Sequence, residues 1–395
     1  MSDARDLIPR PAFVLAAGGT GGHLFPAAAL AEQLVARGAT VHLATDRRAD
    51  AFAAEMPGVD ICRIWAGRLG GGPLRSAYGL AAMAVGLVQA RRLLRRLDPE
   101  AVVGFGGYPS VPTMLAATQL GFATVIHEQN AVLGRANRLL ARRVNRIATG
   151  FADTAGLRPA DRARAVYTGN PVRPAIRSVA QIAYRPPQGQ ATGQSSGTPI
   201  ELVILGGSQG ARIFADIVPP ALAALPPVLR GALRVSQQAR PEDCVRVSAQ
   251  LEAAGIAAEV QSFFSDVPER LARAQLVICR AGASTVAELA AIGRPALLVP
   301  YPHATDDHQA ANARAFATAG AGWLIPQSAF SAPLLTNRLS ELLVDGAGLA
   351  HAAAQARRFA VDDAAERLAA IVLALVPSVG TLEAEPAGRT GERAA

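Results

Sequence analysis

The 395-residue sequence contains no lysine, so every one of its 39 Lys+Arg positions is an arginine. This absence excludes an ordinary P-loop NTPase, whose phosphate loop needs a lysine. Cysteine is nearly absent too, because only Cys62, Cys244 and Cys279 occur, far apart and without a CxxC or Cys/His cluster. That spacing excludes a disulfide framework and a zinc module and predicts reduced thiols in a cytosolic protein.

Long apolar runs are also missing. No window of about 18 uncharged apolar residues occurs, so the sequence predicts no transmembrane helix. The N-terminus has acids and prolines where a signal peptide needs a continuous apolar stretch, so we expect no signal peptide. Aromatic residues are only 5% of the chain and few lie near arginines, which disfavours an RNA-binding sheet and nucleic acid as a partner.

Positive charge is concentrated in the first half of the chain. Residues 1–173 contain 21 arginines against 12 acidic residues, whereas the remainder contains 18 against 19. The excess gathers in two groups: Arg91, Arg92, Arg95 and Arg96, and then Arg135, Arg138, Arg142, Arg143 and Arg146. The first group follows the apolar helical stretch 80–88, a pattern typical of helices on an anionic membrane surface. A solvated basic face is the alternative interpretation.

Two glycine-rich loops are the most informative motifs. GGTGGH at 18–23 and GGSQGA at 206–211 each follow a short aliphatic run, at 12–17 and 202–205, and precede a helix-like segment. Glycine lets the backbone turn sharply and approach a ligand, and the following helix presents unpaired N–H groups and partial positive charge. Each loop is therefore a candidate phosphate site, with helix-on-strand packing as the alternative. Neither loop matches GxGxxG, so a dehydrogenase is disfavoured.

Apolar runs alternate with helical segments along both halves of the chain, which predicts two doubly wound parallel sheets. The expected strands after the first run are 40–45, 101–104, 123–127 and 146–149, and in the second half 233–236, 276–279 and 296–300. Helices are expected at 26–37 and 283–291.

The domain boundaries follow from composition. Residues 178–199 have no apolar period and are rich in Gly, Pro, Gln and Ser, which predicts a flexible loop or linker. We therefore expect a first domain over 11–172 and a second over 173–357. A C-terminal helix at about 358–376 is expected to pack back on the first domain, and residues 377–395 are expected to be disordered.

An ordered series of motifs covers nearly the whole chain from Phe13 to about Val376. The series is GGTGGH (18–23), GGY (106–108), HEQN (127–130), GNPVR (169–173), GGSQGAR (206–212), CRAGASTVAEL (279–289) and DDHQAANA (306–313). Together these motifs resemble the MurG family of glycosyltransferases.

The resemblance implies a GT-B fold and an enzyme that transfers GlcNAc from UDP-GlcNAc, with inversion, to the 4-hydroxyl of MurNAc in lipid I. The product is lipid II of peptidoglycan synthesis, so cell wall, cell shape and cell division are the expected context. The implied partners are UDP-GlcNAc, lipid I (undecaprenyl-pyrophosphoryl-MurNAc-pentapeptide) and the anionic inner leaflet of the plasma membrane. The implied location is the cytoplasmic face of the bacterial inner membrane, as a peripheral protein.

Other functions on this fold remain open from sequence. They are a nucleotide-sugar 2-epimerase, a glycolipid glycosyltransferase, and a non-enzymatic nucleotide-binding or membrane-adaptor protein. The basic stretch beside 80–88 and the first glycine loop favour the transferase. We expect no cofactor and no metal site, because the sequence lacks the Asp-x-Asp motif with which many nucleotide-sugar enzymes hold a metal. Helix N-termini and arginine would then stabilise the leaving group.

His23 is the first candidate for the general base. It ends the first loop at a helix N-terminus, where the positive field favours the neutral imidazole that a base requires. A helix-capping or phosphate-contacting histidine is the alternative. Glu128 is a second candidate base, with a structural hydrogen-bonding role as its alternative.

The donor-binding residues are expected on both halves of the chain. Arg173 suits a bidentate contact with pyrophosphate, and Glu288 suits the two ribose hydroxyls. Ser284 and Thr285 start a helix, so capping is their alternative, while Phe264 is expected beside the uracil, with core packing as its alternative. The full set for UDP-GlcNAc is Thr20, Gly21, Gly22, His23, Asn130, Arg173, Ser208, Phe264, Ser284, Thr285, Glu288, His308, Gln309 and Asn312. For the acceptor and its pyrophosphate it is Gly18, Gly19, Gly106, Gly107 and Tyr108, and for the membrane it is Arg91, Arg92, Arg95 and Arg96.

Overall fold

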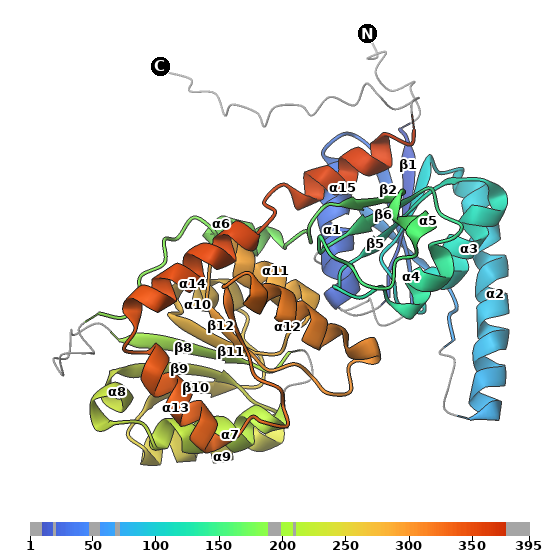
Figure 1. Cartoon of the computed structure of the whole chain (residues 1–395). Coiled ribbons are helices and arrows are strands. Elements are labelled where there is room, and N and C mark those ends of the chain that lie inside the picture. Colours follow the sequence, from blue (N-terminus) through green and yellow to red (C-terminus); the bar gives the residue numbers. More distant parts are fainter. Residues whose placement is uncertain are drawn as a thin grey trace, which may run out of the picture. The chain divides into compact units, whose positions relative to one another are not determined.

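The computed structural model (Figure 1) describes residues 10–18, 21–46, 56–67, 72–188, 199–207 and 211–376. The chain divides into two compact units. The first contains the chain up to Gln129, Leu133–Pro171 and the chain from Asp363 onward; the second contains Asn130–Val132 and Val172–Asp362. The expected tail over 377–395 lies outside the described residues.

The first unit is built on a seven-stranded sheet in the order β3-β2-β1-β4-β5-β6-β7, and its paired strands are all parallel. The strands are β1 Ala12–Ala16, β2 Thr40–Thr45, β3 Val59–Arg63, β4 Ala101–Gly104, β5 Ala123–Glu128, β6 Arg146–Thr149 and β7 Ala165–Tyr167. The helices are α1 Gly21–Val35, α2 Pro73–Leu97, α3 Ser110–Leu120, α4 Arg135–Leu140, α5 Pro159–Arg162 and α15 Ala364–Leu373.

Helices cover both faces of this sheet because the strands are apolar on both sides. In β1, Phe13 and Leu15 join the core formed with α1 and α15, whereas Val14 and Ala16 join the core formed with α2, α3 and α4. The C-terminal α15 contributes Leu368 and Val372 to the first of these cores. The unit is thus a three-layer α/β/α structure (Figure 1).

The second unit repeats the plan with a six-stranded sheet in the order β10-β9-β8-β11-β12-β13, again with parallel pairing. The strands are β8 Ile200–Leu205, β9 Leu233–Gln238, β10 Ala257–Gln261, β11 Leu276–Cys279, β12 Ala296–Leu298 and β13 Gly322–Leu324. The helices are α6 Pro174–Val179, α7 Arg212–Ala223, α8 Pro227–Ala232, α9 Pro241–Ala253, α10 Val267–Arg273, α11 Ala283–Ile292, α12 His308–Thr318, α13 Ala332–Leu342 and α14 Gly346–Phe359.

The expected fold class, two doubly wound parallel sheets, is confirmed. Two local predictions need correction. The first helix begins at Gly21 instead of Pro26, so the proline lies inside α1, where the carbonyl of Gly22 lacks its usual intrahelical N–H donor. The segment expected to be a linker begins inside α6, which ends at Val179; residues 181–188 then lack helix and strand, and 189–198 lie outside the described residues.

Arg294 is a buried cation in the second unit. Its side chain is among the largest that are fully buried, with the residue 1% exposed. The guanidinium donates to the backbone carbonyls of Ile182, Leu271, Ala272, Ile292 and Gly293. Burial lowers its pKa to about 10, so the side chain stays charged at neutral pH. One side chain therefore ties the ends of α10 and α11 to the segment after α6.

Replacing Arg294 by methionine should destabilise the second unit by about 3 kcal/mol or more, because the buried carbonyls lose their donors. The exposed Arg338, which pairs with Glu341 on the surface of α13, is the matched control, and Arg338→Met should change stability by less than about 1 kcal/mol. Urea unfolding followed by Trp323 fluorescence in a Trp65→Phe background measures both. Equal effects of the two substitutions would contradict a structural role for Arg294.

Candidate functional site

Each sheet has a point at which the strand order reverses, between β1 and β4 in the first unit and between β8 and β11 in the second. In doubly wound sheets ligands bind outside the carboxyl ends of the strands at this point. The motif segments at 18–23 and 106–108 follow β1 and β4, and those at 206–211 and 280–285 follow β8 and β11. The sequence motifs therefore gather at the expected ligand-binding edge of each unit.

In the first unit, the glycine loop after β1, at Gly18, contacts the glycine loop after β4, at Gly106 and Gly107. The amide of Gly18 donates to the carbonyl of Gly106 at 3.2 Å. A Cβ atom on Gly107 would lie 3.1 Å from Cα of Gly18 and 3.3 Å from Cδ2 of His23, and Gly107 has a φ of +75°. Only glycine permits both the close approach and this backbone conformation. The contact places the His23 ring against both loops at the start of α1.

A chain of hydrogen bonds leads inward from His23. Its Nδ1 lies 3.3 Å from Oε1 of Gln129, and Nε2 of Gln129 lies 3.1 Å from Nδ1 of His127. Nε2 of His127 lies 3.2 Å from the carbonyl oxygen of Gly169. His127 is fully buried, and this burial lowers its pKa from 6.5 to about 4, so its imidazole is neutral at physiological pH.

The carboxylate of Glu128 forms hydrogen bonds within its own turn of the chain. The residue is 2% exposed, and its Oε2 accepts from the backbone N–H of Gly134 at 2.8 Å and from Nδ2 of Asn137 at 2.9 Å. These bonds hold the turn between β5 and α4. They support the structural alternative for Glu128 over a role as base.

In the second unit, Arg173 and Glu288 form an ion pair with a distance of 2.9 Å between Nε and Oε1. Glu288 is 7% exposed, and its burial raises its pKa, while the charge of Arg173 acts in the opposite direction. The pair joins the turn before α6 to the second turn of α11. Both residues are candidate contacts for the donor, so the structure brings two of the predicted site residues together.

Ser284 and Thr285 lie in the first turn of α11, whose N-cap residue is Gly282. Because a glycine occupies the cap position, neither hydroxyl serves as the N-cap of this helix. Both side chains are half-buried at a helix N-terminus, where backbone N–H groups and the helix dipole favour an anion.

The three candidates on α12 have different surroundings. Asn312 is fully buried; its Nδ2 donates to Asn130 Oδ1 and the carbonyl of Ala281, and its Oδ1 accepts from the amide of Ala131. Oε1 of Gln309 accepts from the amides of Ala281 and Tyr301. Nδ1 of His308, in the first turn, donates to the carbonyl of Thr305 at 2.7 Å. Asn312 thus positions the 130–132 segment within this unit.

Phe264 is buried, at 3% exposed, and the Arg270 guanidinium lies 4.1 Å from its ring centroid. This environment fits the core-packing alternative, whereas the neighbouring Phe263 is 72% exposed. Gly21, Gly22 and Tyr108 lie at the starts of α1 and α3, and Gly19, Thr20 and Ser208 lie outside the described residues.

Three residues of the candidate site are not identified by sequence reasoning. For His127 and Gln129, membership in HEQN is the only signal in the sequence. Arg280, in the CRAG motif, donates to the carbonyls of Val299 and Pro300 and lies 5.5 Å from the ring centroid of Tyr301. Within the described ranges, no group of three or more His, Cys, Asp or Glu side chains is placed to hold a metal ion.

Comparisons with known proteins give the family. Residues 13–149 match the glycosyltransferase family 28 N-terminal domain and residues 201–368 match the glycosyltransferase family 28 C-terminal domain. The UDP-N-acetylglucosamine--N-acetylmuramyl-(pentapeptide) pyrophosphoryl-undecaprenol N-acetylglucosamine transferase of Rhodospirillum centenum is 53% identical over 360 residues, which is 91% of this chain and 93% of the relative. The enzyme of the same name from Rhodospirillum rubrum is 54% identical over 91% of each chain. The crystal structure of Acinetobacter baumannii MurG superposes with a TM-score of 0.73 at 30% identity, covering 93% of this chain and 100% of that one.

The chain belongs to the MurG family. The motifs of the MurG family form a defined structural feature in each unit. In the first, glycine contacts place a histidine at a helix N-terminus; in the second, a buried ion pair and a helix N-terminus lie beside one another along α11.

His127 makes a testable contribution to the stability of this MurG-family chain. The unfolded chain takes up a proton below about pH 6.5, whereas the folded chain keeps His127 neutral down to about pH 4. The stability present above pH 6.5 is therefore lost as the pH falls through this window, by about 2 kcal/mol at pH 5. Urea unfolding at pH 7.5 and pH 5 should show that loss in the native protein in excess of the loss in His127→Gln. Parallel losses in the two proteins would show that His127 is not buried as a neutral group.

Proposed function

We propose that this MurG-family chain transfers GlcNAc from UDP-GlcNAc to the 4-hydroxyl of MurNAc in undecaprenyl-pyrophosphoryl-MurNAc-pentapeptide and so makes lipid II. The observation that carries the proposal is similarity along nearly the full chain to transferases named for this donor and acceptor. The two glycosyltransferase domains match the two compact units in order.

The first unit provides the base and receives the acceptor. His23 takes the proton from the acceptor hydroxyl, the oxygen forms a bond to the anomeric carbon, and UDP leaves with the electron pair of the broken bond. A single displacement of this kind inverts the anomeric centre. The acceptor's pyrophosphate binds beside the N-terminus of α3, next to the backbone of Gly106 and Gly107.

The second unit binds the donor. Glu288 accepts hydrogen bonds from the ribose hydroxyls, and Arg173, already paired with Glu288, extends the positive field toward the diphosphate. The N-terminus of α11, with Ser284 and Thr285, stabilises the leaving diphosphate. Gln309 and His308 contact the GlcNAc hydroxyls. Helix dipole and guanidinium thus take the place of a bound metal in this proposal.

The membrane-facing surface of the first unit lies on α2. The apolar side chains Tyr78, Leu80, Val85 and Val88 are exposed at 68%, 60%, 46% and 46%. Val85, Val88, Arg92 and Arg95 follow one another at helical spacing, so apolar and basic side chains share one exposed face. No helix in the described part of the chain is long and apolar enough to span a bilayer. From the exposed apolar and basic face of α2 we propose a peripheral attachment at the cytoplasmic face of the inner membrane.

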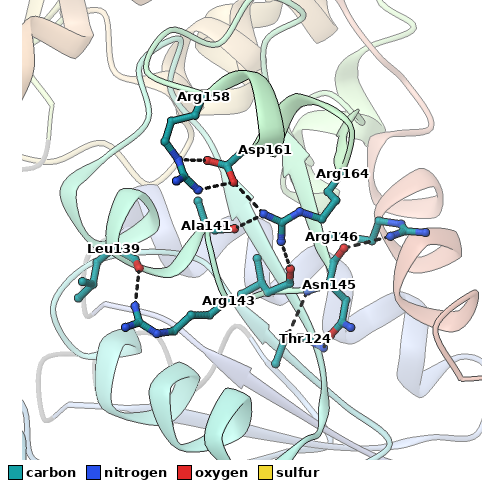
Figure 2. Close-up of polar contacts among 10 residues, drawn as sticks. Thr124, Leu139, Ala141, Arg143, Asn145, Arg146, Arg158, Asp161 and Arg164 are labelled. Carbon is teal, nitrogen blue, oxygen red and sulfur yellow. Dashed lines mark hydrogen bonds and ion pairs between the residues drawn. The ribbon is translucent and has the colours of Figure 1, made fainter.

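The second arginine group forms a further basic region of the first unit. A cavity of about 640 Å³ is lined by Arg135, Arg138, Leu139, Arg142 and Arg143. Figure 2 shows that Arg143 and Arg146 donate to the backbone carbonyls of Leu139 and Asn145, which do not cancel their charge. The nearby carboxylate of Asp161 instead accepts from Arg158 and Arg164, and the bond from Arg158 keeps the pKa of Asp161 below its usual value (Figure 2).

Purified protein should release UDP from UDP-GlcNAc only when a lipid I analogue is present, and the product should be a β-linked disaccharide. EDTA should leave the rate unchanged, because no step is assigned to a metal. UDP release without acceptor, or conversion of UDP-GlcNAc into its epimer, would reject the proposed function. Loss of turnover in EDTA that magnesium restores would reject the metal-free donor site.

Glu288→Ala should weaken UDP-GlcNAc binding by about 1–3 kcal/mol, because the ribose hydroxyls and Arg173 lose a buried partner. Titration calorimetry with UDP and 2′-deoxy-UDP sharpens the test. The native protein should prefer UDP, the Glu288→Ala variant should lose that preference, and the exposed Glu252→Ala on α9 should keep it. A variant that still prefers UDP would remove Glu288 from the ribose site.

Changing Arg91, Arg92, Arg95 and Arg96 together to Gln should lower binding to anionic vesicles and activity on a membrane-embedded acceptor. Each arginine near such a surface contributes about 1 kcal/mol, attenuated by salt. Activity on a short-chain soluble acceptor should persist. The control variant changes four exposed arginines of the second unit, Arg185, Arg234, Arg314 and Arg338, to Gln. Equal loss of activity on both acceptors would show that the α2 arginines act on the fold or the site instead.

A further inference from the structure

The hydrogen-bonded chain in the first unit has a fixed direction. It begins at the carbonyl oxygen of Gly169, runs through His127 and Gln129, and ends at His23. A carbonyl oxygen can only accept, so the group facing it must donate. Nε2 of His127 therefore carries a proton, and because the ring is neutral, its Nδ1 is left as an acceptor.

At Gln129, too, each hydrogen bond has a fixed donor and acceptor. Its Nε2 donates to Nδ1 of His127 at 3.1 Å and to the backbone carbonyl of His127, also at 3.1 Å. If the amide were rotated by 180°, Oε1 would face the two acceptors on His127, Nδ1 and the backbone carbonyl. Because Gln129 is only 3% exposed, these acceptors and Oε1 would then be buried without hydrogen bonds. The backbone carbonyl of Gln129 is itself fixed by Nδ2 of Asn170 at 2.8 Å. The Oε1 atom of Gln129 must therefore face His23.

The last step sets the state of His23. Because Oε1 of Gln129 can only accept, Nδ1 of His23 must carry a proton to donate to it. In the neutral ring the lone pair then lies on Nε2. In water the neutral imidazole of histidine prefers the proton on Nε2. The hydrogen bonds from Gly169 to His23 therefore select the tautomer that is less populated in solution.

We propose that Gln129 and His127 are positioning residues that hold His23 as the Nδ1–H tautomer and thereby give Nε2 the role of proton acceptor. The inference deepens the proposed function, since it rests on His23 as the base for the acceptor hydroxyl. The O–H bond of that hydroxyl breaks, its proton moves to Nε2, and its electron pair forms the bond to the anomeric carbon. The resulting imidazolium keeps its Nδ1–H bond to Gln129 and later returns the transferred proton to solvent.

The tautomer can be observed directly in the full chain. The protein has six histidines, so labelling with ¹⁵N-histidine gives few signals, and the signals of His23 are those lost in His23→Gln. At pH 7.5 the Nδ1 of His23 should resonate as a protonated nitrogen and Nε2 as an unprotonated one. The reverse pattern would overturn the proposal, and this measurement requires no variant of Gln129 to fold.

Kinetics of two substitutions separate positioning from packing. Gln129→Leu should lower kcat by about 100-fold while KM for UDP-GlcNAc stays within about twofold, and the His23 signals should shift toward the Nε2–H form. Gln129→Glu restores an acceptor for Nδ1–H of His23, and its buried carboxyl, when protonated, donates to Nδ1 of His127 as the amide does, so this variant should recover at least about tenfold of the lost kcat. Gln250→Leu, an exposed change on α9, is the control.

Unchanged kcat in Gln129→Leu would overturn the positioning role, as would equal damage in the Leu and Glu variants, which is the result expected if Gln129 only packs. Failure of the proposed function has a different signature. In that case the native protein itself transfers no GlcNAc to the lipid I analogue, while the ¹⁵N signals still decide the tautomer.

Discussion

The carbonyl oxygen of Gly169 can accept a hydrogen bond but never donate one, and the polar interior of the first unit is organised from that restriction. It keeps the proton of neutral His127 on Nε2, where it can be donated, and so orients the amide of Gln129. The Oε1 atom of that amide in turn accepts a hydrogen bond from Nδ1–H of His23. The groups come from three separate segments: the turn at 168–170 after β7, the end of β5 and the first turn of α1. Because His127 and Gln129 are buried, no water is needed to complete the chain, and an alternative arrangement leaves unpaired polar atoms.

The two units share a strand order but carry different chemistry. At the reversal point of the first sheet, glycine loops approach closely enough to hold an imidazole between them. At the equivalent place in the second sheet, a helix N-terminus and the Arg173–Glu288 pair form a charged surface. In the proposed function the same fold serves proton transfer in one unit and recognition of a nucleotide diphosphate in the other, and the difference lies in the side chains and loops after the strands.

The fold class was predictable because the central strands are continuous apolar runs. The expected bounds of β2, β4, β6 and β11 agree with the structure. The four edge strands β3, β7, β10 and β13 were not predicted, because each is short or consists mainly of exposed and half-buried residues without a continuous apolar run. Buried arginine at position 294 also gave no signal, since its partners are backbone carbonyls that the sequence does not reveal.

The site was predictable only where a local motif marked it. The glycine loops and His23 are contiguous in sequence, but Gln129 is 106 positions from His23, and Glu288 is 115 positions from Arg173. Such pairings depend on how strands are ordered in the sheet, so a single sequence does not disclose them. Local hydrogen bonds also favour a structural role for Glu128, because its carboxylate accepts from the backbone N–H of Gly134 in the turn that follows it.

The most direct test of the account is chemical rescue of His23→Ala. If His23 removes the proton from the acceptor hydroxyl, this variant should lose about 100- to 1,000-fold in kcat, and added imidazole should restore part of the rate in proportion to its neutral form. A variant with undiminished kcat would contradict the account. So would a loss that imidazole does not restore and that is matched by an equal loss of UDP-GlcNAc affinity, since His23 would then be a phosphate contact instead of a base.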